Sequence, residues 1–123
     1  MTVESSSRQA VQAIYACRDD PRLCVADALE AYANALRRLA PRLAPPLRRL
    51  PDIVARAAAR VRAARTDREA IGAVADAIGQ VHKVIALLRA DDPITLKSET
   101  RSGAQVAAIL EAADVRLEKA TGL

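Results

Sequence analysis

Aromatic residues are almost absent from this chain, which has no phenylalanine, no tryptophan and two tyrosines among its 123 residues. Aromatic and β-branched side chains favour β-strands, so their scarcity argues against a sheet. Alanine, the residue with the highest helix propensity, accounts for 28 positions. A hydrophobic fraction of 51% excludes a disordered composition. The composition therefore predicts an all-α fold with thin, closely packed helix interfaces.

The sequence lacks the usual signals of several functional classes. No segment reaches the roughly 18 consecutive apolar residues of a membrane-spanning helix. The first eight residues do not resemble a signal peptide, and the four glycines are too scattered for a phosphate-binding loop. One histidine and two cysteines fit no known zinc spacing. The sequence therefore predicts no cofactor, no metal and no enzymatic activity.

Hydrophobic periodicity predicts helices over about 6–18, 21–40, 52–65 and 67–90, and a fifth towards the C-terminus. The expected N-caps are Ser5–Ser7, Asp20, Asp52 and Thr66, and the expected C-terminal stop is Gly122. The helix over 67–90 has the most regular heptad pattern, so we expect it to be central, with Ile78 and Val81 almost fully buried.

The expected architecture is one compact four- to five-helix bundle spanning residues 1–123, mostly antiparallel, with one crossover. Residues 1–5 are predicted to be a disordered start. Residues 41–51 contain four prolines and three leucines, which predicts an ordered, Pro-rich crossover lying on the bundle. The Asp-Asp pairs at 19–20 and 91–92 each precede a proline, so helix capping explains them better than a two-carboxylate site.

Small residues form a strip along the predicted fourth helix. Gly72 and Gly79 lie on one helical face with His82, the sole histidine. Each glycine costs about 1 kcal/mol relative to alanine inside a helix, which suggests a close approach by another group. A close helix–helix contact is the favoured interpretation. The alternative is that the strip forms the floor of a groove that binds a small ligand, with His82 as its polar group.

Cys17 and Cys24 flank the Asp20-Pro21 turn between the first two predicted helices. Such a corner can bring two Cα atoms within the range that a disulfide requires, about 4.4–6.8 Å. A disulfide between Cys17 and Cys24 is therefore predicted, with two buried free thiols as the alternative. An oxidised pair would place the protein in the periplasm or outside the cell, and a reduced pair in the cytoplasm.

Positive charge is concentrated in residues 37–68, which contain ten arginines and only two acidic residues and so carry a net charge of +8. The rest of the chain carries −4. Arg49, Arg56 and Arg60 could align into a surface patch that meets phosphates or an acidic protein. A solvated arginine face is the simpler interpretation. Interleaved aromatic residues are lacking, which weakens the case for single-strand binding by base stacking.

Three functional hypotheses follow. The leading one is a non-enzymatic protein-interaction module that binds another protein and is exported if the disulfide forms. The second is a nucleic-acid-associated protein that uses the arginine cluster at 37–68. The third is a small-ligand carrier that uses the Gly72, Gly79 and His82 strip. The alanine and arginine content further suggests a GC-rich bacterial source.

Overall fold

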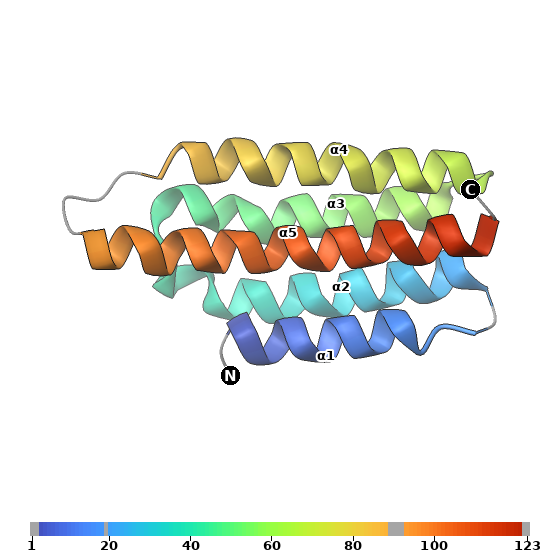
Figure 1. The fold of residues 1–123 in the computed structure, drawn as a ribbon, viewed down its shortest axis with the longest axis horizontal. Coiled ribbons are helices and arrows are strands. Elements are labelled where there is room, and N and C mark those ends of the chain that lie inside the picture. The colour runs from blue at the N-terminus through green and yellow to red at the C-terminus, as the bar shows by residue number, and fades with distance from the viewer. Residues whose placement is uncertain (1–2, 19, 89–92, 122–123) are drawn as a thin grey trace.

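The computed structural model describes residues 3–18, 20–88 and 93–121, which form a bundle of five α-helices (Figure 1). Successive helices run in opposite directions along the long axis of the bundle. The described residues contain no β-strand, which confirms the predicted all-α bundle. The helices are α1 (Val3–Tyr15), α2 (Pro21–Leu39), α3 (Leu50–Ala63), α4 (Asp67–Ala86) and α5 (Pro93–Thr121).

Two of the predicted N-caps are confirmed. The Asp20 carboxylate accepts hydrogen bonds from the backbone N–H groups of Arg22 and Leu23. The Thr66 hydroxyl accepts one from the Glu69 N–H at 3.1 Å. Both caps satisfy amide groups that the first turn of a helix leaves without a partner. Asp52 is not a cap, because α3 begins two residues earlier and Asp52 lies in its first turn.

The start of α1 differs from the prediction. Helix α1 begins at Val3, so residues 3–5, which were expected to be disordered, are helical, and the serines lie inside the helix rather than at its cap. Ser6 and Ser7 are buried. The Ser7 hydroxyl forms a hydrogen bond of 2.9 Å with the hydroxyl of Tyr32 on α2, which ties α1 to the bundle through a buried polar contact.

The burial of Tyr32 predicts a loss of stability at alkaline pH. Burial raises the pKa of Tyr32 to about 12, and the hydrogen bond with Ser7 acts in the opposite direction. Above pH 10 the unfolded chain releases this proton while the folded chain keeps it, so stability falls as pH rises from about 10 to about 12. Between pH 9 and 11 we expect a loss of about 1 kcal/mol from this residue.

Urea unfolding of the parent and of Tyr32→Phe at both pH values measures this effect. Phenylalanine cannot ionise, so the variant lacks this contribution, although it unfolds more easily than the parent at pH 9 because the bond to Ser7 is lost. An equal pH dependence in the two proteins would contradict the assignment to Tyr32.

The Pro-rich segment is ordered, as predicted, and contains two short 3₁₀ helices, Ala40–Arg42 and Pro45–Arg49. Leu47 is fully buried, which anchors the segment to the core. The segment joins α2 to α3 at one end of the bundle, and these two helices are direct neighbours. It therefore forms a corner between adjacent antiparallel helices rather than a path across the bundle.

Helix α4 does not occupy the central position, because both α2 and α5 contact more of the other helices than α4 does. Helix α2 packs against α1, α3 and α5, whereas α4 lies at an edge, against α3 and α5 (Figure 1). Val81 is fully buried as expected, but Ile78 is only partly buried. The expectation that α4 is central was wrong because a regular apolar stripe shows that a helix has a buried side and does not show how many neighbours cover it.

The glycines of α4 do not mark a close contact. Gly72 and Gly79 are exposed, and a Cβ atom built at either would meet no atom within 4 Å. The favoured interpretation of this strip as a helix–helix contact is therefore wrong. Gly103 on α5 is the glycine at a close approach, since a Cβ there would lie 2.6 Å from Cγ1 of Ile85 on α4. It lets α4 and α5 pack closely.

Helix α5 is a single helix of 29 residues. It begins at Pro93, a position that the sequence had left open. The expected cap at Asp91-Asp92 and the expected stop at Gly122 lie outside the described residues, as does Asp19. Across the described ranges, none of the helices combines the length and the apolar character that crossing a membrane requires.

Candidate functional site: a basic groove between α3 and α4

Part of the predicted positive cluster is neutralised by acidic residues from other helices. Arg62 on α3 contacts Asp27 at 2.5 Å and Glu30 at 2.7 Å, both on α2. Arg60 contacts Asp76 on α4 at 3.1 Å, and Arg37 lies 3.7 Å from Asp52. All these side chains are substantially exposed, so each ion pair contributes little stability, of the order of 0–1 kcal/mol. Their main effect is to lower the net charge of the cluster.

The uncompensated cations gather at one end of the α3–α4 pair. Arg49, Arg56 and Lys83 are exposed and line one cavity of about 400 Å³. No acidic side chain forms an ion pair with any of these three among the described residues. We call this cavity the basic groove and define it by its lining residues, Arg49, Asp52, Ile53, Arg56, Gln80, Lys83, Val84 and Leu87.

The floor of the basic groove is aliphatic. Ile53 is 8% exposed and Val84 is 4% exposed, while Leu87, at the end of α4, leaves 53% of its surface in water. An exposed leucine beside three cations makes a surface that can bury an apolar side chain and pair with carboxylates at the same time. Asp52 adds one negative charge at the rim.

Arg49 ends the short 3₁₀ helix Pro45–Arg49 and is the residue before α3, and Arg56 lies seven residues further along, on α3 itself. Seven residues are almost two helical turns, and both side chains line the groove. Helix α4 runs antiparallel to α3 and places Lys83 on the same groove. The sequence identified Arg49 and Arg56 as candidates but missed Lys83 and Leu87, because only the pairing of α3 with α4 brings them there.

Arg60, the third predicted member of the patch, lies apart from the basic groove. It pairs with Asp76 and lines a second cavity of about 500 Å³ together with Gly72. Gly79 and His82 are exposed on α4 and line neither of these two cavities. The structure therefore does not bring Gly72, Gly79 and His82 together around one ligand site.

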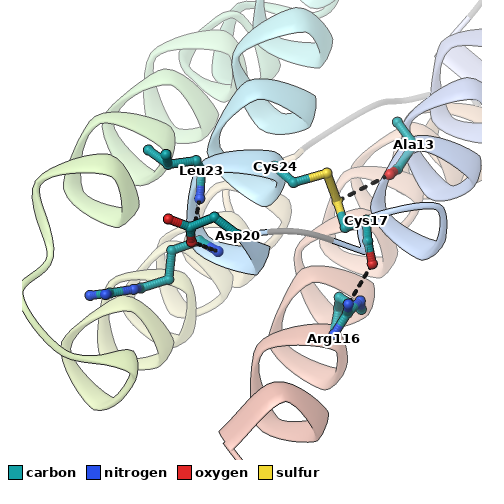
Figure 2. The surroundings of a disulfide bond; sticks show 7 residues. Ala13, Cys17, Asp20, Leu23, Cys24 and Arg116 are labelled. Atoms are coloured by element: carbon teal, nitrogen blue, oxygen red, sulfur yellow. Dashed lines mark hydrogen bonds between the residues drawn. A yellow bond between two sulfur atoms is a disulfide. The ribbon is translucent and has the colours of Figure 1, made fainter.

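The cysteines lie at the far end of the bundle from the basic groove, where α1 turns into α2. Cys17 and Cys24 form a disulfide with a Cα–Cα distance of 5.7 Å, as predicted (Figure 2). The guanidinium group of Arg116 on α5 donates a hydrogen bond to the backbone carbonyl of Cys17. The disulfide thus joins α1 to α2, and Arg116 links α5 to the same corner.

No group of three or more metal-ligating side chains occurs within residues 3–18, 20–88 and 93–121. The lining of the basic groove instead offers guanidinium, ammonium and aliphatic groups, which suit it to binding anions and apolar side chains together. Comparison with known proteins finds no matching family, no matching curated protein and no matching solved structure.

Proposed function

We propose that this protein is a non-enzymatic interaction module that binds another protein through the basic groove. The observation that carries the proposal is the combination of three uncompensated cations with the half-exposed Leu87. A protein segment that bears carboxylates and an aliphatic side chain matches both properties of this surface.

The same features argue against nucleic acid as the ligand. A sugar-phosphate backbone offers little apolar surface to cover Leu87, and the Asp52 carboxylate at the rim repels its phosphates. The groove lining also contains no aromatic ring on which a base could stack. A protein segment is therefore the better fit.

Binding of an acidic, leucine-containing peptide tests the proposal. The probe is a fluorescein-labelled synthetic peptide of alternating Glu and Leu pairs, measured by fluorescence anisotropy. The parent should bind it at low salt, and the reversal Arg49→Glu with Arg56→Glu should weaken binding at least about tenfold, because attraction becomes repulsion at two positions. Affinity of the parent should fall at about 300 mM salt, since exposed charges are then screened.

A matched control distinguishes an effect of the groove residues on binding from an effect of the net charge. Arg38→Glu with Arg101→Glu changes the net charge by the same amount at exposed positions outside the groove. This control should bind like the parent. Equal weakening by the two double variants would contradict a site in the groove. Tighter binding of single-stranded DNA than of the peptide would instead support a nucleic-acid-associated function.

We also propose that the protein works in an oxidising compartment, outside the cytoplasm. The support is the Cys17–Cys24 disulfide, because structural disulfides persist in oxidising environments and are rare in the cytosol. Counting free thiols under denaturing conditions, in protein taken from its native source, tests this. Two free thiols per chain would contradict it.

A further inference from the structure

Helices α1 and α2 lie side by side (Figure 1), and a cavity of about 210 Å³ lies between them. Each helix contributes four lining residues at positions i, i+3, i+4 and i+7, which share one side of a helix. Five of the eight are alanines, whose methyl groups leave the space between the helices unfilled. We call this space the α1–α2 cavity and define it by its lining residues, Ser6, Gln9, Ala10, Ala13, Ala28, Ala31, Tyr32 and Ala35.

The α1–α2 cavity is open to solvent and mostly apolar inside. Gln9, Ala13 and Ala31 are exposed at its rim, whereas Ala10 and Ala28 are buried. A small molecule can therefore enter from the surface without unfolding the bundle. None of the eight lining residues is charged, so an ion placed here would lose hydration without gaining a counter-charge. The cavity therefore suits a neutral ligand.

Ser6 supplies the α1–α2 cavity with a hydrogen-bonding group that the protein itself leaves unused. Ser6 is only 3% exposed, and its hydroxyl has no hydrogen-bond partner among the described residues. The hydroxyls of Ser7 and Tyr32, close by, bond to each other at 2.9 Å and not to Ser6. A buried hydroxyl without a hydrogen bond destabilises the folded state, and such groups are rare in native proteins. A ligand hydroxyl that bonds to Ser6 would remove that cost.

The volume of the α1–α2 cavity limits the size of the ligand. A cavity of about 150 Å³ is large enough for benzene. At about 210 Å³, the α1–α2 cavity admits a ring of that size with a small substituent. We propose that it binds a small neutral molecule with an apolar body of this size and one hydroxyl, which forms a hydrogen bond with Ser6. This site is independent of the basic groove, since no residue lines both.

Two probes that differ by one hydroxyl, phenol and benzene, test the proposal with the full chain. Each is titrated into isotope-labelled protein, and NMR follows the backbone amide signals. Both probes should shift the signals of residues that line the α1–α2 cavity. Ala31→Leu should weaken binding of both at least about tenfold, because the leucine side chain occupies the cavity. The control Ala75→Leu changes an exposed alanine of α4 outside the cavity and should bind like the parent.

Ser6→Ala isolates the hydrogen bond to the ligand. The ratio of the benzene Kd to the phenol Kd should fall by about fivefold, because alanine cannot bond to the phenol hydroxyl. Comparing the two probes in the two proteins cancels their different hydration. The control Ser98→Ala removes an exposed hydroxyl from α5 and should keep the ratio of the parent. Ser6→Ala should also be at least as stable as the parent, since it removes a buried hydroxyl without a partner.

Several results would overturn the proposal. One is the lack of any shift with either probe at about 10 mM, and another is a set of shifts confined to residues outside the α1–α2 cavity. A third is an unchanged ratio of the two Kd values in Ser6→Ala. A Ser6→Ala variant less stable than the parent would show that the hydroxyl already has a partner, which also contradicts the proposal. The acidic peptide is not used here, so the proposed function of the basic groove stands or fails separately.

Discussion

Replacing Leu29 with alanine is expected to lower the free energy of unfolding by about 3–5 kcal/mol, the largest effect of any change considered for this protein. Leu29 is fully buried on α2, the helix that contacts α1, α3 and α5. The substitution removes buried aliphatic groups and leaves a cavity. Its neighbours belong to several helices, so they cannot all move to fill it.

Ile78→Ala on α4 is the matched control, because it also shortens a large aliphatic side chain. Ile78 is only partly buried at the edge of the bundle, so we expect a loss below about 2 kcal/mol. Urea unfolding followed by far-ultraviolet circular dichroism measures both variants. A larger loss for Ile78→Ala than for Leu29→Ala would show that α4, and not α2, forms the centre of the core.

Removal of the disulfide should lower the free energy of unfolding by about 2–3 kcal/mol. The bond joins two residues that are seven positions apart, so it closes a short loop and restricts the unfolded chain. The double variant Cys17→Ala with Cys24→Ala measures this loss without leaving a free thiol. We expect α1 to separate from the bundle first, since the bond joins α1 to α2 at their connection.

A reducing agent provides the internal control for this prediction. It should lower the stability of the parent to about that of the double variant and leave the double variant unchanged. A parent that is equally stable with and without reductant, while its thiols are shown to be free, would contradict a stabilising role for the bond.

Local signals in the sequence were sufficient to predict most of the helices. Caps such as Asp20 and Thr66, and the Asp20-Pro21 turn, act within four residues of themselves, so they could be recognised without knowing the fold. The disulfide was predictable for the same reason, because Cys17 and Cys24 lie on either side of one local turn. The early start of α1 was missed because Ser7 is buried against Tyr32 of α2, a contact between residues far apart in the sequence.

The candidate site was only partly predictable. Arg49 and Arg56 could be identified from the charge run, and their separation by seven residues, almost two helical turns, favoured a common face. Which arginines keep an uncompensated charge depends on acids in other helices: Asp76 pairs with Arg60, and Asp27 with Arg62. No local pattern contains that information.

The all-α class, the Asp20 and Thr66 caps and the proximity of Cys17 and Cys24 could be predicted from the sequence, because each depends on interactions between residues close along the chain. Three features could be recognised only from the packing of the helices: α4 lies at an edge of the bundle, Gly103 rather than Gly79 marks a close contact, and Lys83 and Leu87 complete the basic groove. An amphipathic stripe fixes which side of a helix is buried, but the choice of neighbour comes from the packing of all five helices together.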